Sequence, residues 1–324
     1  MPKEILRVKN LVTEFWGDDH PTRAVDKVSF HVNEGEILGI VGESGCGKSV
    51  TSMSVMRLIP EQAGGVTEGE ILFDGKNILS ISKKEFSKIV GKDLTMIFQE
   101  PLSSLNPLLT CGYQIVESLR FHEKTGKKEA WAKAQQLLEM VGIPLPEKRV
   151  REYPHQLSGG MRQRVMIAMA IACSPKLLIA DEPTTALDVT IQAQILDILK
   201  RLQRERNMAV MFITHDMGVI ADISDRVLVM YAGNVVEEAP VKQFFKNPLH
   251  PYTKGLLKAI PRPDTKNKRL YMIKGTVPGP EEQYTMTGCK FCDRCEDALP
   301  RCRKERPEMK DMGGGQKTAC WLYQ

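Results

Sequence analysis

The feature that most constrains this chain is the glycine-rich stretch Gly42-Glu43-Ser44-Gly45-Cys46-Gly47-Lys48-Ser49. The apolar run Ile37 to Val41 precedes it, and no helix breaker follows it until Pro60. A strand, a glycine-rich turn and a helix start, in this order, are the context in which G-x-x-x-x-G-K-[ST] forms a phosphate-binding loop. A plain glycine-rich turn, the alternative, does not require that order.

The residue types in this loop suit a triphosphate. Glycines let the backbone turn so that successive N–H groups surround phosphate oxygens, and the following helix adds the positive end of its dipole. Lys48 is expected to reach the β- and γ-phosphates, and the Ser49 hydroxyl to hold Mg²⁺. The loop residues predicted to bind the nucleotide are Gly42, Ser44, Gly45, Cys46, Gly47, Lys48, Ser49 and Val50.

Composition and charge narrow the functional class. The 324 residues suffice for one large or two modest domains with a buried core. The formal net charge of +5 is spread along the chain, so no nucleic-acid partner is indicated, and the basic run 266–269 is expected to be a solvated linker. No stretch nears the roughly 20 apolar residues of a membrane span, and no signal-peptide pattern is present. We expect a cytosolic protein that reaches a membrane only through partners.

Alternating apolar and polar residues predict a small sheet before and after the loop. Residues 5–8 and 28–32 are predicted to be half-buried antiparallel strands, and 69–75 a strand closed by an Asp-Gly turn. Residues 226–236 are predicted to form a hairpin. Phe15, which precedes a charged turn, could stack on a nucleotide base or belong to the core.

Three more apolar runs predict buried strands that end in polar side chains. Parallel α/β sheets bind ligands at the carboxyl ends of their strands. Asp181 is expected to help hold Mg²⁺ and Glu182 to address a water molecule. His215 is expected to contact the γ-phosphate or that water. The runs are 93–98, ending at Gln99, 177–180, ending at Asp181-Glu182, and 209–214, ending at His215.

Helices are predicted between these strands. Residues 101 to about 154 have helical periodicity and form a predicted insertion between two halves of the sheet domain. The stretch LSGGM at 157–161 follows. Ser158 is a good N-cap, and Gly159 and Gly160 leave the first-turn amides unobstructed, so this helix start is either a second anion site or an ordinary cap.

Cysteines crowd into the C-terminal part of the chain. Cysteines of a cytosolic protein are expected to be thiols or metal ligands rather than disulfides. Four thiolates can bind a [4Fe–4S] cluster or Zn²⁺, and the tight C-x2-C-x2-C run favours the cluster, with zinc and free thiols as alternatives. The surrounding 261–315, rich in Pro and Gly, contains little that could fold unaided, so the metal is expected to be a structural local core. These cysteines are Cys289, Cys292, Cys295, Cys302 and Cys320.

Together these motifs resemble the complete motif set of an ABC-type ATPase. The matching elements are GESGCGKS, Gln99, LSGGM, the strand LLIADE, TALD at 185–188 and His215, in the family's order over residues 1 to about 240. The resemblance implies that Phe15 stacks on the base, that Glu182 is the general base and that His215 is the γ-phosphate switch. It also implies that Gln99 is an Mg²⁺ ligand that reports nucleotide state to the transport partner.

The resemblance further implies a dimer. Ser158, Gly159 and Gly160 would bind the ATP held by a second ATPase subunit, identical or paralogous, so that two chains close around two nucleotides. Contacts of the γ-phosphate would hold this dimer shut until hydrolysis releases it. Closure would pass to membrane subunits through the helical insertion near Gln99.

Other stretches place the chain more finely. Residues 99–107, 247–253 and 277–279 are similar to the dipeptide/oligopeptide branch of bacterial importers, which also contains nickel importers. That branch implies two membrane permease subunits, an extracytoplasmic peptide-binding protein and a peripheral location on the cytoplasmic face of the bacterial cell membrane. Cys289, Cys295, Cys302 and Cys320 resemble the spacing in the C-terminal extension of this branch, where some members carry an iron–sulfur cluster. Cys292 departs from that spacing and could compete as a ligand.

The expected fold is α/β: a P-loop NTPase (RecA-like) core with an N-terminal antiparallel β subdomain, a helical insertion subdomain and a small C-terminal cysteine-rich metal-binding extension. The expected boundaries are 1–240 for the ABC ATPase domain and 241–324 for the extension. Within the ATPase domain, the core is expected at 1–100 and 165–240 and the helical subdomain at about 101–164.

The leading hypothesis is the ATP-hydrolysing subunit of a peptide importer. Its first rival is the same ATPase serving nickel or another small solute, because such subunits do not contact the cargo. A soluble ABC protein acting on DNA or ribosomes is a second rival, but it predicts paired cores or a long coiled-coil insertion, and neither is present. A third possibility is a soluble ABC ATPase whose cysteine module senses metal or redox state.

Overall fold

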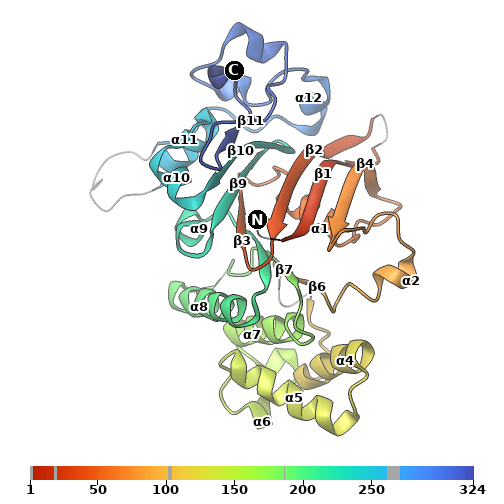
Figure 1. Cartoon of the computed structure of the whole chain (residues 1–324). Helices are drawn as coiled ribbons and strands as arrows, with labels where there is room; N and C mark the ends of the chain where they lie inside the picture. The colour runs from red at the N-terminus through yellow and green to blue at the C-terminus, as the bar shows by residue number, and fades with distance from the viewer. Residues whose placement is uncertain (1–2, 18–19, 101–103, 186, 261–270) are drawn as a thin grey trace. The chain divides into compact units, whose positions relative to one another are not determined.

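The computed structural model describes residues 3–17, 20–100, 104–185, 187–260 and 271–324 (Figure 1). Part of the predicted 99–107 stretch, Ala186 of TALD and the basic run 266–269 lie outside the described residues. The chain divides into two compact units. Unit 1 comprises Met1–Leu6, Val32–Glu36 and Leu72–Ile213, and unit 2 comprises Arg7–His31, Ile37–Ile71 and Thr214–Gln324.

Unit 1 contains three neighbouring parallel strands, as the apolar runs predicted. β7 (Leu177–Asp181) lies between β6 (Leu94–Ile97) and β8 (Ala209–Ile213). Every residue of β7 and β8 is buried, which explains why these runs carry apolar residues without alternation. The parallel pairing brings the carboxyl ends of these strands, where Gln99 and the Asp-Glu pair follow, to one edge.

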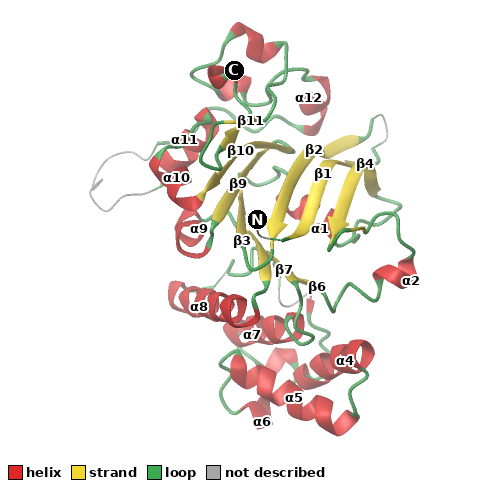
Figure 2. Ribbon diagram, in the orientation of Figure 1, coloured by secondary structure: helices red, strands yellow, loops and turns green. Residues whose placement is uncertain are grey.

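Helices make up most of the rest of unit 1, and the predicted helical insertion is confirmed. α4 packs against α5, whose Ala134 and Leu138 are buried, and Thr110 caps the first turn of α4. Figure 2 shows α4, α5 and α6 gathered as a group of helices. Over its described residues, unit 1 contains the helices α2 (Lys83–Phe86), α4 (Cys111–Glu123), α5 (Lys127–Met140), α6 (Pro146–Arg149), the 3₁₀ turn η1 (Pro154–Gln156), α7 (Gly159–Ala170) and α8 (Val189–Arg206).

Unit 2 is built on β3 (Ile37–Val41), which pairs in parallel with β9 (Arg226–Tyr231). β9 and β10 (Asn234–Pro240) form the predicted antiparallel hairpin. The C-terminal residues extend this sheet, because β12 (Lys317–Thr318) pairs with β10 and β11 (Lys310–Asp311) pairs with β12. The helices of unit 2 are α1 (Lys48–Val55), α9 (Met217–Ile223), α10 (Val241–Lys246), α11 (Pro251–Lys258) and α12 (Pro280–Thr285).

A second sheet contains the long N-terminal strands in the order β2-β1-β4-β5. The predicted Asp-Gly turn is confirmed: Asp74 and Gly75 both have positive φ, 46° and 79°, and join the antiparallel pair β4–β5. The strands are β1 (Glu4–Phe15), β2 (Thr22–Asn33), β4 (Gly64–Phe73) and β5 (Lys76–Asn77).

The C-terminal residues of unit 2 have little regular structure and pack onto its core. Phe291, 3% exposed, lies against the buried rings of Tyr231 and Tyr252, at centroid distances of 5.2 and 5.3 Å. Short 3₁₀ turns punctuate the region, namely η2 (Cys292–Arg294), η3 (Pro300–Arg303) and η4 (Trp321–Tyr323).

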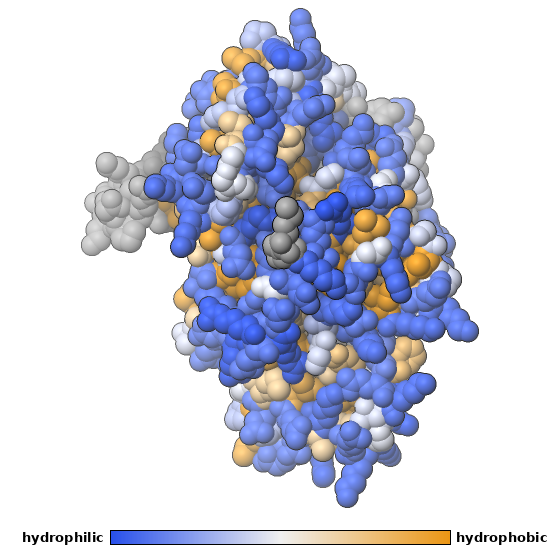
Figure 3. All heavy atoms as spheres, viewed as in Figure 1, coloured by the Kyte–Doolittle hydropathy of each residue, from blue (hydrophilic) through white to orange (hydrophobic). Residues whose placement is uncertain are grey.

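Polar side chains cover most of the surface seen in Figure 3, with apolar residues scattered among them. Within the described ranges, no helix combines the length and the hydropathy that crossing a bilayer requires.

Candidate functional site

The glycine-rich loop joins β3 to α1 in unit 2, as predicted. Lys48 is 6% exposed, and its ammonium donates to the carbonyl oxygens of Gly42 and Glu43 at 2.9 and 3.1 Å. A buried ammonium that donates to neutral carbonyls is poorly compensated electrostatically. The loop therefore presents a positive charge where a phosphate group would neutralise it.

Close backbone packing explains two of the loop glycines. Gly47 has φ +95°, and a Cβ there would lie 2.5 Å from the carbonyl oxygen of Ala24. At Gly42 a Cβ would lie 2.2 Å from the carbonyl oxygen of Met230. Gly47 is also the N-cap of α1 and offers no side-chain cap, so first-turn N–H groups remain for a ligand. The loop thus fits the predicted triphosphate.

Two residues far along the chain contact the second loop residue, Glu43. The Glu43 N–H donates to the Tyr252 hydroxyl at 2.9 Å, and the guanidinium of Arg294 donates to both Glu43 carboxylate oxygens. Sequence reasoning identified Tyr252 only as part of the stretch 247–253 and did not identify Arg294. A contact between residues so far apart leaves no periodic or motif signal.

In unit 1 the predicted Asp-Glu pair ends β7. Asp181 is 5% exposed, whereas Glu182 is half-buried and has φ +46°, a left-handed conformation that costs a non-glycine residue energy. The Glu182 carboxylate accepts hydrogen bonds from Gln99 Nε2 at 3.1 Å and from Thr185 Oγ1 at 3.0 Å. The structure therefore brings Gln99 and Glu182 together and fixes the direction of the carboxylate.

The LSGGM stretch starts α7 in unit 1. Ser158 caps this helix, as predicted, and its hydroxyl accepts from the Met161 N–H at 3.4 Å. A Cβ at Gly159 would meet nothing within 4 Å, so the helix start is open at this residue, whereas a Cβ at Gly160 would lie 2.9 Å from the Ile191 side chain. Binding of a nucleotide by Ser158, Gly159 and Gly160 remains a prediction.

His215 and Phe15 lie in unit 2. His215 is exposed, and the next residue, Asp216, caps α9 by accepting from the Gly218 N–H at 2.7 Å. Phe15 is half-buried at the end of β1, while the adjacent Trp16 is 51% exposed and donates from its indole to the Glu61 carbonyl at 3.0 Å. The roles predicted for His215 and Phe15 remain predictions.

We call residues 289–320 the cysteine segment. Its five thiols line one small cavity of about 10 Å³, which His250 and Phe291 also line. Burial raises the pKa of Cys289 to about 12 and that of Cys295 to about 11. Among the described residues, no three Cys, His, Asp or Glu side chains are placed to hold one metal ion. All five cysteines of the segment are free thiols that line the same cavity: Cys289, Cys292, Cys295, Cys302 and Cys320.

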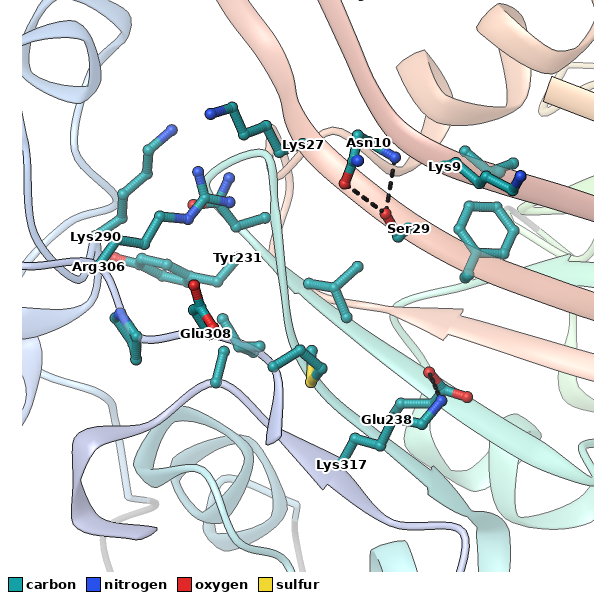
Figure 4. A pocket seen from close by; sticks show the side chains of 18 of the residues that line it. Lys9, Asn10, Lys27, Ser29, Tyr231, Glu238, Lys290, Arg306, Glu308 and Lys317 are labelled. Carbon is teal, nitrogen blue, oxygen red and sulfur yellow. Dashed lines mark hydrogen bonds and ion pairs between the residues drawn. The ribbon is translucent and has the colours of Figure 1, made fainter. Parts of the chain in front are cut away.

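A much larger cavity of about 770 Å³ in unit 2 shares Cys289, Phe291 and Pro307 with the cysteine cavity (Figure 4). None of the predicted nucleotide-binding loop residues lines it. Arg306 and Lys290, which line it, both contact the Asp26 carboxylate, at 2.8 and 3.4 Å. Burial alone would raise the pKa of Asp26, but these two cations and a hydrogen bond from Asn234 together outweigh burial and lower it. The cationic lining residues are Arg7, Lys9, Lys27, Lys290, Arg306 and Lys317, against the acidic Glu238 and Glu308.

A phosphate loop between β3 and α1, a buried strand ending in Asp-Glu and a helix capped by the serine of LSGGM define an ATP-binding cassette. Two family models match: "ABC transporter" over residues 25–185 and "Oligopeptide/dipeptide transporter, C-terminal region" over residues 236–302. Relatives match over almost the whole chain. The chain belongs to the family of ATP-binding proteins of oligopeptide and dipeptide ABC transporters.

Three relatives illustrate the similarity. The oligopeptide transport ATP-binding protein OppD of Bacillus subtilis is 54% identical, covering 98% of this chain and 88% of its own length. The oligopeptide transport ATP-binding protein AppD of the same organism is 49% identical, with 99% and 97% covered. The dipeptide transport ATP-binding protein DppD of Escherichia coli is 48% identical, with 98% and 96% covered.

Solved structures support the cassette fold. The ATP-binding cassette MJ0796, in a dimeric post-hydrolysis state bound to ADP and Pi, has a TM-score of 0.66 at 31% identity. The match covers 73% of this chain and 98% of that one. cbiO1 from Clostridium perfringens, part of the ABC transporter complex cbiONQ, has a TM-score of 0.63 at 27% identity, covering 76% and 92%.

Proposed function

We propose that this chain is the ATP-hydrolysing subunit of an ABC importer of dipeptides or oligopeptides. The observation that carries the proposal is the 48–54% identity, over nearly the whole chain, to proteins named for dipeptide and oligopeptide transport. The loop geometry supports the ATPase half of the proposal, because Lys48 is buried with carbonyl partners that a triphosphate can replace.

The chain's residues divide the work of hydrolysis. Lys48 and the loop N–H groups bind the phosphates, Phe15 stacks on the base, and His215 contacts the γ-phosphate. Glu182 accepts the proton of the water that attacks the γ-phosphorus, which breaks the bond to the β-phosphate oxygen. Ser49, Gln99 and Asp181 supply the hard oxygen ligands that Mg²⁺ prefers. When bound there, Mg²⁺ would supply positive charge that neutralises the phosphates.

Two chains would share each nucleotide. In the proposed dimer, Ser158, Gly159 and Gly160 of one subunit cover the ATP bound to the loop of the other, which is identical or paralogous. The open start of α7 supports this role. The solved relative MJ0796 is dimeric.

We place the ATPase domain at 1–240 and the extension at 241–324. We also propose that the chain binds two membrane permease subunits at the cytoplasmic face of the membrane. An extracytoplasmic peptide-binding protein would be an indirect partner that delivers peptide to these permeases.

The cysteine segment is proposed to hold a [4Fe–4S] cluster through Cys289, Cys295, Cys302 and Cys320. A zinc ion needs four ligands about 2.3 Å from one centre, whereas the thiolates of a cluster bind separate irons. The five thiols line one small cavity, which supports a shared site for such a group. Zinc is the alternative, and Cys292 is the extra thiol.

The test uses the native transporter genes in a strain that lacks this chain. Uptake of a labelled dipeptide is expected to return with the wild-type chain and not with Glu182→Gln, while Glu34→Gln, which changes an exposed carboxylate, restores it. If the chain restored nickel uptake and no peptide uptake, the cargo would be nickel and the proposed peptide cargo would be wrong.

The same variant tests the role of the base. With ATP, Glu182→Gln is expected to accumulate as an ATP-bound dimer in size-exclusion chromatography and to lose roughly 10²–10⁴-fold in turnover. Normal turnover by Glu182→Gln would remove Glu182 from the role of base.

A further inference from the structure

The cysteine segment makes a direct ion pair with the phosphate loop. Arg294 lies in η2, between Cys292 and Cys295. Its Nη1 and Nη2 donate to Glu43 Oε2 and Oε1 at 2.6 and 3.0 Å, so the pair is bidentate. Bidentate, charge-assisted pairs are among the stronger polar contacts and fix geometry as well as charge.

Arg294 is held rigidly for this contact. Its side chain is 7% exposed, Nε donates to the Lys274 carbonyl at 3.0 Å, and Nη1 also donates to the Tyr231 hydroxyl at 3.3 Å. The guanidinium carbon lies 5.7 Å from the centroid of the Tyr231 ring, within cation–π range. The hydrogen bond to Glu43 raises the pKa of Arg294 above its ordinary value, so this side chain stays charged.

Glu43 passes this constraint to the lysine that binds phosphate. Its N–H donates to the Tyr252 hydroxyl at 2.9 Å, while its carbonyl accepts from Lys48 Nζ at 3.1 Å. One loop residue therefore contacts α11, the cysteine segment and Lys48. Movement of Arg294 would change the loop conformation around the Lys48 ammonium.

Charge adds a second reason for the pair. Glu43 places a carboxylate inside a loop that must bind a polyanion, and like charges at close range repel. Arg294 neutralises that carboxylate. Without Arg294, the Glu43 charge would oppose the phosphates.

We propose that Arg294 is a positioning residue through which the cysteine segment sets the ATP affinity of the phosphate loop. With the segment intact, Arg294 neutralises the Glu43 carboxylate and holds the loop in a conformation that binds phosphate. When the segment is disrupted, Arg294 is released and ATP binds more weakly. The inference rests on the proposed ATP-binding function and adds its regulation.

The first experiment measures the dissociation constant of Mg-ATP by calorimetry on the full chain. Arg294→Gln is expected to weaken ATP binding about tenfold, equivalent to ~1.4 kcal/mol. Adding Glu43→Gln to that variant removes the uncompensated carboxylate and should restore most of the affinity. Arg294→Lys keeps the charge but loses the bidentate fork. Its ATP affinity should lie between those of Arg294→Gln and of the double variant.

Arg303→Gln is the matched control. Arg303 lies in the same segment and pairs with Asp293 at 2.6 Å, but this pair is exposed and does not reach the loop. The ATP affinity of Arg303→Gln is expected to stay within twofold of the wild-type affinity.

The second experiment tests the link to the cysteines. Cys295→Ser should weaken ATP binding in the wild-type background and have no further effect when Arg294→Gln and Glu43→Gln are already present. Hydrogen exchange of residues 42–48 should quicken in Cys295→Ser and in Arg294→Gln, but not in Arg303→Gln.

The outcomes separate this inference from the proposed function. If the wild type binds ATP and Arg294→Gln binds it equally well, or if Glu43→Gln gives no rescue in folded protein, the coupling is wrong. Failure of the wild type to bind ATP would contradict the ATPase assignment instead.

Discussion

The buried strands and the cysteine segment of this chain are stabilised in different ways. In β7 and β8 every residue is buried and, apart from Asp181, apolar. Each large apolar side chain removed from water contributes roughly 1.5–3 kcal/mol. The cysteine segment has two-residue strands and 3₁₀ turns instead, and Cys292 and Cys302 are among its buried side chains.

The difference shows where each region takes its order from. The strands need only a sequence of apolar residues and neighbours to pair with. The cysteine segment depends on the packing of the buried ring of Phe291, on polar contacts with the rest of unit 2 and on whatever its thiols bind. Perturbing thiols and polar contacts should therefore affect this segment far more than the strands.

The largest effect is expected from the thiols. Cys295→Ser with Cys302→Ser should increase proteolytic cleavage within residues 271–324 roughly tenfold, because metal binding and folding are coupled in small metal-dependent regions. Mass spectrometry of the fragments measures the rate. Cys173→Ser, a buried thiol of unit 1, is the control and should leave that rate unchanged. Equal cleavage rates within residues 271–324 for the double cysteine variant and for Cys173→Ser would contradict the proposed dependence of the cysteine segment on its thiols.

An intermediate effect is expected where the C-terminal residues meet β10. Glu237 is fully buried and accepts from the Leu249 and His250 N–H groups and from Gln316 Nε2, at 2.9, 2.8 and 3.1 Å. Glu237→Gln turns an amide N–H₂ toward donors and should cost ~1–3 kcal/mol.

Differential scanning fluorimetry measures this loss as a melting temperature about 2–4 °C lower per kcal/mol. Glu68→Gln, at an exposed strand position, is the control. A Glu237→Gln protein that melts with the wild type would show that these hydrogen bonds do not stabilise the sheet extension.

The smallest effect, and one that depends on pH, is expected at Asp26. Its pKa is lowered from the usual 3.8 because Arg306 and Lys290, with a hydrogen bond from Asn234, outweigh the effect of burial. Its stabilisation is therefore present above about pH 4 and is lost as pH falls through the lowered pKa. Asp26→Asn should lower the melting temperature at pH 7, by about 2–4 °C if the loss is ~1 kcal/mol, and by less at pH 3. A difference that does not shrink on acidification would exclude this ion pair as the cause.

Local patterns predicted most of the cassette. The loop between β3 and α1, the buried strands of unit 1 and the hairpin of β9 and β10 follow from apolar runs and turn residues, which act between near neighbours. The polar strand ends were predicted one by one, and the hydrogen bond between Gln99 and Glu182 shows that two of them meet.

Long-range contacts could not be predicted in this way. Arg294 is one of several cations in a polar region, and only the folded chain brings it to Glu43. The pairing of β12 with β10 was missed as well, because two-residue strands carry no periodicity. The left-handed backbone of Glu182 was equally hidden, since nothing in LLIADE distinguishes it from an ordinary strand end.

That backbone conformation has an evolutionary consequence. At φ +46° a glycine would fit position 182 with less strain, by roughly 1 kcal/mol, so folding alone disfavours the residue that occupies it. The role of general base proposed for Glu182, and not stability, would account for a carboxylate at a position whose backbone conformation disfavours it.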